Sequence, residues 1–158
     1  MAAKTNALRL LDAAGIPYKT REYDYDAKNP CGVRPEDLDA SLRERMFKTL
    51  VTRGDKTGIN VFCIPVSEEL DLKKCASAAG DKRIEMVPMK DILGLTGYIR
   101  GGCSPVGMKK KYPTIFDETA LLYDEIFVSG GQQGLQIELE PQALINFVDG
   151  TIADLTKG

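Results

Sequence analysis

Seven residues, Gly101 to Gly107, restrict this chain more than any other stretch, because they contain three glycines and a proline. Glycine reaches backbone angles that are closed to other residues, and proline fixes its own angle and has no amide hydrogen. Neither a helix nor the interior of a central strand tolerates this composition. We therefore expect a rigid loop with several amides turned outward, which could bind an anion or a carbonyl oxygen.

The residues on either side of this loop suggest what it binds. Residues 98–100 lead into it as an expected strand, and residues 108–111 leave it with three lysines. A glycine loop beside a basic run indicates a site for a phosphate-bearing ligand. A plain tight turn with a solvated basic face explains the same residues equally well, and the motif alone does not decide between the two.

The chain of 158 residues is long enough to bury one core, and no repeat or linker divides it. We therefore expect a single domain over residues 1–158. Its 43% hydrophobic and 28% charged residues are ordinary for a soluble globular protein. No apolar run is long enough to span a membrane and the N-terminus lacks an apolar signal segment, so we expect a cytoplasmic protein.

Charge and residue types exclude several classes of function. A net charge of −2 argues against sequence-independent coating of nucleic acid, although Lys109, Lys110 and Lys111 could still grip one end of an RNA. Histidine is absent, which removes histidine bases and most zinc sites. We expect no cofactor and no metal.

The four cysteines form no CxxC pair. Cys63 lies in an apolar run and Cys75 in a helical pattern, so both are expected to be buried core residues. Cys103 lies in the glycine loop. Without a histidine to activate it, a nucleophilic role for Cys103 is disfavoured.

Hydrophobic periodicity and turn residues predict an α+β fold. The expected helices are a first one capped by Thr5 and ended by Gly15, then 35–45, 71–80, 88–94 and 141–148. The expected strands are 17–23, 46–52, 60–66, 82–87, 113–117, 125–129 and 135–139, the last with one buried and one open face, before a short polar tail over 149–158.

Lys48 is the unusual residue of the strand 46–52. Alternation puts Lys48 on the same strand face as Met46 and Leu50. Lysine side chains are rarely buried in proteins. Lys48 therefore either reaches solvent from a strand edge or points into a polar cavity, and the pattern alone favours the edge.

Several separated stretches resemble one family. They are Phe47-Lys48-Thr49-Leu50, Asp71-Leu72-Lys73-Lys74, Val87-Pro88, Thr96-Gly97-Tyr98, the 101–107 loop, Tyr112-Pro113-Thr114-Ile115 with Asp117, Val128-Ser129-Gly130-Gly131 and Gly134-Leu135-Gln136-Ile137-Glu138-Leu139. Together they are similar to YbaK/EbsC-type proteins, the freestanding relatives of the editing insertion domain of bacterial prolyl-tRNA synthetase. This resemblance implies a mixed, mostly antiparallel sheet curled toward a barrel, with helices around it.

The resemblance also implies a function. Family members hydrolyse the ester between a wrong amino acid and the terminal ribose of tRNA, most often tRNA for proline. The YbaK branch, which this chain resembles more, removes cysteine, and the insertion-domain branch removes alanine. The implied partners are the acceptor end of the tRNA and prolyl-tRNA synthetase, with no membrane. A non-catalytic module that holds aminoacyl-tRNA or the synthetase would use the same residues. A nucleotide-binding regulator is disfavoured, because GxxxxGK[ST] is missing.

Carried onto this sequence, the resemblance names the site residues. Lys48 matches the essential lysine, whose ammonium would hold the terminal phosphate or polarise the ester. Amides of Gly101 and Gly102, with Ser104 in the same loop, would stabilise the oxyanion. The candidate substrate-binding residues are Tyr23, Thr49, Cys103, Asp117, Ser129, Gly131 and Gln136, although Asp117 also fits a structural role.

Two departures from the family pattern put the amino-acid specificity in doubt rather than the chemistry. Cys31 or Gly32 stands where the YbaK pattern has an aromatic residue, and Gln136 stands where some members have an aspartate. With no histidine base, the chemistry is expected to rely on positioning, electrostatics and the substrate itself. A cysteinyl substrate would supply its own thiol, and an alanyl substrate would need a bound water.

Overall fold

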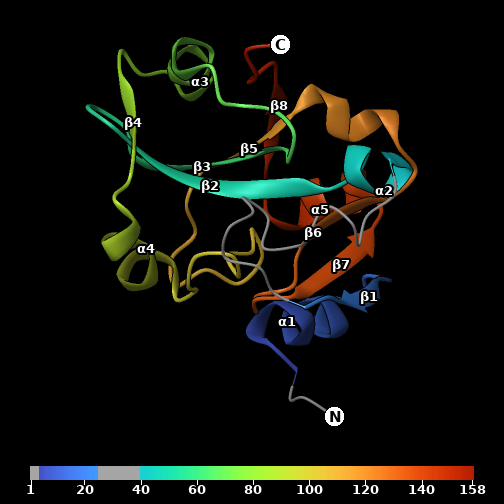
Figure 1. Cartoon of the computed structure of the whole chain (residues 1–158). Helices are drawn as coiled ribbons and strands as arrows, with labels where there is room; N and C mark the ends of the chain where they lie inside the picture. The colour runs from blue at the N-terminus through green and yellow to red at the C-terminus, as the bar shows by residue number, and fades with distance from the viewer. Residues whose placement is uncertain (1–3, 25–39) are drawn as a thin grey trace.

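The computed structural model of the chain describes residues 4–24 and 40–158. Helices and strands alternate along it, which confirms the α+β class (Figure 1). In chain order they are α1 (Asn6–Ala14), β1 (Lys19–Glu22), α2 (Ala40–Glu44), β2 (Phe47–Gly54), β3 (Gly58–Pro65), α3 (Leu72–Ala79), β4 (Ile84–Met86), α4 (Met89–Thr96), β5 (Thr114–Asp117), the 3₁₀-helix η2 (Glu118–Leu122), β6 (Ile126–Ser129), β7 (Leu135–Leu139), α5 (Pro141–Phe147) and β8 (Thr151–Ala153). No helix in these ranges is long and apolar enough to cross a membrane.

Capping residues set the ends of α1 and α3. Thr5 Oγ1 accepts a hydrogen bond from the amide of Leu8 at 3.2 Å, and the Asp71 carboxylate accepts from amides in the first turn of α3. Gly15 and Gly80 end the two helices in the left-handed conformation, with φ of 70° and 73°. The predicted cap at Thr5 and the predicted ends at Gly15 and Gly80 are confirmed.

The strands form two sheets. Five lie in the order β4-β2-β3-β5-β8 and three in the order β1-β7-β6. Four strand pairs are antiparallel, whereas β3–β5 and β5–β8 are parallel. A parallel bridge between Met46 and Phe127 joins the sheets where β2 passes β6. The mixed, mostly antiparallel pairing is confirmed, but the strands do not close into one barrel.

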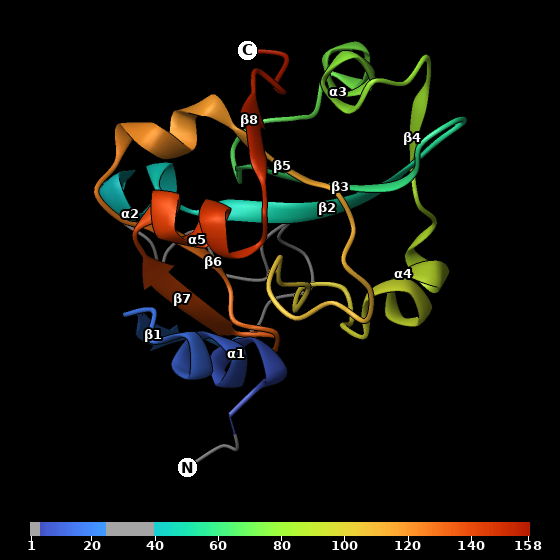
Figure 2. The same cartoon turned by 180° about the vertical axis from the view of Figure 1, so that it is seen from behind.

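The largest hydrophobic cluster fills the space between the two sheets and α1, which lies beneath β1 and β7 in both views (Figures 1 and 2). Leu11 of α1, Phe47 of β2 and Ile137 of β7 are fully or almost fully buried there. Val106 of the glycine loop belongs to the same cluster, so the loop is anchored in the core. Cys63 and Cys75 are also fully buried, as predicted.

Three predictions of secondary structure are wrong. Residues 98–100 are irregular, because Gly97 ends α4 with a φ of 84° and the Tyr98 amide is bonded to Thr96 Oγ1. The tail forms the short strand β8, which pairs with β5. Both faces of β7 are buried, since Glu138 pairs with Arg45 at 2.8 Å and Gln136 faces a cavity.

Candidate active site

A cavity of about 280 Å³ opens beside the middle of β2. Its walls come from β2, the segment from β4 into α4, the turn at Gly101, and β6 with β7. The lining residues are Phe47, Lys48, Thr49, Leu50, Val51, Met86, Val87, Met89, Ile92, Arg100, Gly101, Cys103, Ser129 and Gln136. Six of the predicted site residues thus meet in one place: Lys48, Thr49, Gly101, Cys103, Ser129 and Gln136.

Lys48 contributes its charge to the wall formed by β2. It lies opposite Ile64 in the ladder with β3, and its side chain is half-buried. Arg100, in the turn before Gly101, is the second cation of the lining. No carboxylate belongs to the lining that the structure describes. Two cations in the described lining can hold an anionic group or polarise a carbonyl oxygen.

The main chain of β2 turns alternately toward β3 and away from it, as in any antiparallel ladder. The amide of Val66 donates to the carbonyl of Met46 at 2.9 Å, so the even-numbered residues of β2 are bonded to β3. On the opposite edge, the amide of Val87 donates to the carbonyl of Val51 at 3.1 Å. Odd-numbered residues therefore direct their main chain away from β3.

Thr49 is the odd-numbered residue in the middle of the cavity wall. Its amide and carbonyl face the edge of β2 that points away from β3. Among the residues that the structure describes, β4 pairs with this edge along Thr52 to Gly54 and the Val87 amide bonds to Val51, and no strand pair includes Thr49 on that side. A strand edge of this kind presents one donor and one acceptor to a ligand.

The glycine pair forms a tight turn rather than two outward amides. The amide of Gly102 donates to the carbonyl of Ile99 at 2.9 Å, and Gly101 has a φ of 84°, which suits the third position of a type II turn. A Cβ atom on Gly102 would lie 3.0 Å from the amide nitrogen of Gln133. The expectation that the Gly102 amide faces the substrate is therefore wrong: this amide closes the turn, and the residue packs against the chain at 132–133.

Ser104 also serves the loop itself. It is fully buried, is absent from the cavity lining, and its Oγ accepts from the amide of Val106 at 3.2 Å. Tyr98 donates its hydroxyl proton to the Val106 carbonyl at 2.6 Å. These bonds hold the loop rigid behind Gly101 and Cys103, which do line the cavity.

Cys103 is buried at 9% exposure, and burial raises its thiol pKa to about 11. The thiol is therefore protonated at neutral pH. A protonated thiol is a poor nucleophile, which agrees with the low expectation for nucleophilic catalysis by this residue.

Gln136 brings an unsatisfied acceptor into the cavity wall. It is 4% exposed, and its Oε1 has no hydrogen-bond partner within the described chain. Ser129 lies opposite Gln136 in the β6–β7 ladder and accepts from the amide of Gly131 at 3.2 Å. The hydroxyl of Tyr23 is buried and has no partner among the described residues. Tyr23 and Gly131 do not belong to the lining that the structure describes, and Tyr23 packs instead against Met46, Val66 and Phe127.

The family model of the aminoacyl-tRNA editing domain matches residues 33–147. A protein of Enterococcus faecalis (strain ATCC 700802 / V583), described as "Putative Cys-tRNA(Pro)/Cys-tRNA(Cys) deacylase EbsC", is 47% identical over 156 residues, which are 97% of this chain and 93% of that protein. The chain belongs to the YbaK/EbsC family of editing domains.

Solved structures share the fold of this chain. One, described as "Crystal structure of a putative trans-editing enzyme for prolyl tRNA synthetase", is 25% identical, with a TM-score of 0.78 over 99% of this chain and 100% of the other. A hypothetical protein with 19% identity has a TM-score of 0.81 over 97% of this chain and 100% of its own, and shares the fold.

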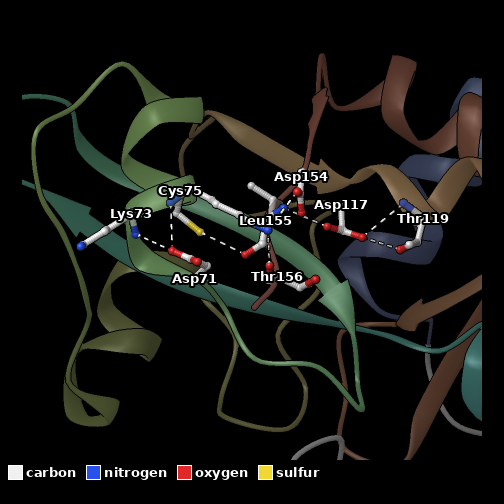
Figure 3. Close-up of polar contacts among 9 residues, drawn as sticks. Asp71, Lys73, Cys75, Asp117, Thr119, Asp154, Leu155 and Thr156 are labelled. Atoms are coloured by element: carbon white, nitrogen blue, oxygen red, sulfur yellow. Dashed lines mark hydrogen bonds and ion pairs between the residues drawn. The ribbon is translucent and has the colours of Figure 1, made fainter. Parts of the chain in front are cut away.

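Asp117 lies outside the cavity of this YbaK/EbsC domain. It is 2% exposed, and its carboxylate accepts from the amide of Leu155 at 3.0 Å, the amide of Thr119 at 3.2 Å and the hydroxyl of Thr119 at 2.5 Å (Figure 3). These bonds cap η2 and tie β5 to the C-terminal segment. The geometry matches the structural alternative for Asp117 and gives it no place in the substrate cavity.

The sequence did not identify the apolar wall of the cavity, namely Met86, Val87, Met89 and Ile92. Each of these residues looks like an ordinary core position of a strand or helix. Arg100 was missed too, although its position beside the glycine pair was a usable signal. The family departure at Cys31 or Gly32 lies outside the described residues. Within residues 4–24 and 40–158, no group of three or more His, Cys, Asp or Glu side chains is arranged to hold a metal ion.

Proposed function

We propose that this protein is a trans-editing aminoacyl-tRNA deacylase and that its substrate is Cys-tRNA(Pro). The observation that carries the proposal is that Lys48 and Gly101, far apart in sequence, line the same small cavity. The relative in E. faecalis, similar over nearly its full length, is described as a deacylase of this kind, which supports the choice of cysteine. The activity would operate in the cytoplasm.

Lys48 is assigned to the reacting ester. Its ammonium either polarises the ester carbonyl or holds the phosphate of the terminal adenosine. The Arg100 guanidinium at the same cavity provides a second positive charge for that phosphate.

The oxyanion donors are assigned to amides that the fold leaves available. The Gly102 amide is used in its turn, so the donors are the amides of Gly101 and Thr49. An amide of this kind contributes on the order of 100-fold in rate. The edge of β2 at Thr49, where no described strand pairs with it, supports this assignment.

The attacking group comes from outside the protein. The chain has no histidine, and the Cys103 thiol is protonated at neutral pH. On a cysteinyl ester, the substrate's thiol sulfur attacks its own carbonyl carbon. The C–S bond forms, the C–O bond to the ribose breaks, and the thiol proton ends on the ribose oxygen. The cyclic thioester that leaves is then hydrolysed by water.

A panel of mischarged tRNAs tests the proposal. We expect cysteinyl-tRNA(Pro) to be cleaved fastest, and seryl-tRNA(Pro), whose hydroxyl is a weaker nucleophile, at least about tenfold more slowly. Equal rates on the seryl and cysteinyl esters would refute the thiol route. Preferred cleavage of alanyl-tRNA(Pro) would reassign the substrate.

A single-turnover measurement separates this enzyme from a binding module. If excess protein protects the labelled cysteinyl ester instead of consuming it, the protein is a binder and the proposal fails. The same mixture with prolyl-tRNA synthetase added tests the synthetase as a partner, since one similar structure is described as that of "a putative trans-editing enzyme for prolyl tRNA synthetase".

A further inference from the structure

An apolar surface lies beside the entrance of the cavity. Met86, Met89, Leu93 and Ile99 are 47%, 58%, 53% and 48% exposed, which is far more than large apolar side chains usually are. We call these four residues together with Arg100 the mouth surface. Apolar surface gathered at one place on a protein is typical of an interaction site.

The mouth surface continues into the cavity. Met86, Met89 and Arg100 also line the cavity, so they form its rim. Leu93 follows Met89 by one turn on the same side of α4. The Arg100 guanidinium lies 3.9 Å from the sulfur of Met89, which joins the turn at residues 99–101 to α4. A chain that leaves the cavity over this rim meets the surface directly.

Positive charge surrounds this surface. Lys90 extends from the first turn of α4, and Lys109 donates to the Gly94 carbonyl at 3.4 Å at the other end of the helix. Asp91 is the acidic residue in α4, and Glu85 is paired with Arg83 at 2.6 Å. Among the described residues at this surface, the cations at positions 90, 100 and 109 therefore outnumber the acid at position 91.

The other lysines of the basic run are used elsewhere. Lys111 is paired with Asp149, and Lys110 and Lys111 border a separate hollow of about 220 Å³ beside α5. Of the three lysines predicted to hold an RNA end, Lys109 is therefore the one that the structure shows bonded to α4.

We propose that the mouth surface binds the unpaired 3′ strand of an RNA, with its bases lying on Met89, Leu93 and the Arg100 guanidinium. This inference rests on the proposed function, because the terminal ester occupies the cavity. Proteins bind single-stranded RNA ends by stacking the splayed bases on flat side chains such as arginine, with cations along the phosphates. Methionine side chains are flexible enough to pack against the flat face of a base. The cations at positions 90, 100 and 109 favour a polyanionic ligand such as RNA.

Binding of a short RNA hairpin with an unpaired 3′ tail tests the inference. We expect Leu93→Glu to weaken binding about tenfold, because it places a carboxylate where a base and phosphates lie. Removing the unpaired tail from the hairpin should weaken its binding to the wild-type protein by the same factor. The matched control is Leu122→Glu, which changes a 74% exposed leucine of η2, far from α4 in both views (Figures 1 and 2).

Two substrates separate this inference from the proposed function. With a cysteinyl ester of adenosine alone, Leu93→Glu should keep the wild-type rate, whereas with the cysteinyl hairpin KM should rise about tenfold. Unchanged hairpin binding in Leu93→Glu, with a wild-type melting temperature, would overturn the inference. So would loss of synthetase binding in that variant with RNA binding intact. If the wild type cleaves neither ester, the proposed function fails, and the hairpin affinities still decide the role of the surface.

Discussion

The cavity in the structure differs in one main-chain amide from the site that the residue types predict. Glycines 101 and 102 suggest a pair of outward amides, but the second amide closes a turn onto Ile99. We assign the replacement to the Thr49 amide, on the edge of β2 that pairs with β4 only from Thr52 onward. Residue type does not reveal this, because an amide's direction is set by strand pairing.

We predict that Thr49→Pro lowers the rate of ester cleavage on the order of 100-fold, because proline removes one oxyanion donor. A strand tolerates proline where its amide points away from the ladder, so the fold should persist. The comparison is Thr49→Val, which keeps the amide and should lose no more than about tenfold. Equal rates for the two variants, measured in single turnover with matching melting curves, would show that the amide has no role.

Residue-scale prediction from sequence named Lys48 and the glycine loop, and the structure places Lys48 but only part of that loop at the cavity. Ser104 and Gly102 lie in the predicted stretch and still face inward, because the hydrogen bonds of a tight loop turn neighbouring residues in opposite directions. Gln136 and Ser129 come from strands whose predicted ranges match the structure closely. Their meeting with Lys48 depends on how two sheets pack, which no local pattern encodes.

At the scale of elements, Asp117 holds β5, η2 and the C-terminal segment together (Figure 3). Most predicted helices and strands occur close to their predicted bounds, since caps and alternation are local signals. The three-residue strand β8 was missed because it is too short to show a pattern, and it exists only through its pairing with β5.

We predict that Asp117→Ala lowers the free energy of unfolding by about 2 kcal/mol, because the buried Leu155 amide loses its acceptor. The refolded variant should keep its cleavage rate per folded molecule, since the residue lies outside the cavity. Urea titration and single-turnover cleavage on the same sample check both statements. A stable variant with lost activity would instead restore Asp117 to the substrate site.

At the scale of the whole molecule, burial of several weak acids makes stability depend on alkaline pH. Burial raises the pKa of Cys63 and Cys75 to about 12 and that of Cys103 to about 11, from an ordinary value of 9.0. Above pH 9 the unfolded chain releases these protons while the folded chain keeps them. The free energy of unfolding must therefore fall as pH rises from about 9 toward 12.

We predict a lower urea midpoint at about pH 10.5 than at about pH 8, and a smaller difference in the Cys103→Ala variant, which has one such proton fewer. Side chains elsewhere that titrate above pH 9 affect both proteins alike, so the variant isolates the thiol. Equal pH dependence in the two proteins would show that Cys103 is accessible to water in the folded state.

The cavity is a property of the assembled fold, because β2, α4, the glycine turn and β7 each supply only part of it. The proposed function depends above all on the Lys48 ammonium acting on an aminoacyl ester in this cavity. The most direct measurement is single-turnover cleavage of cysteinyl-tRNA(Pro) by Lys48→Ala, beside Lys73→Ala, which removes an exposed lysine of α3. We predict a loss on the order of 100-fold or more for Lys48→Ala, with an unchanged melting temperature and full activity in the control. A folded Lys48→Ala variant that cleaves the ester at the wild-type rate would contradict this role for the lysine.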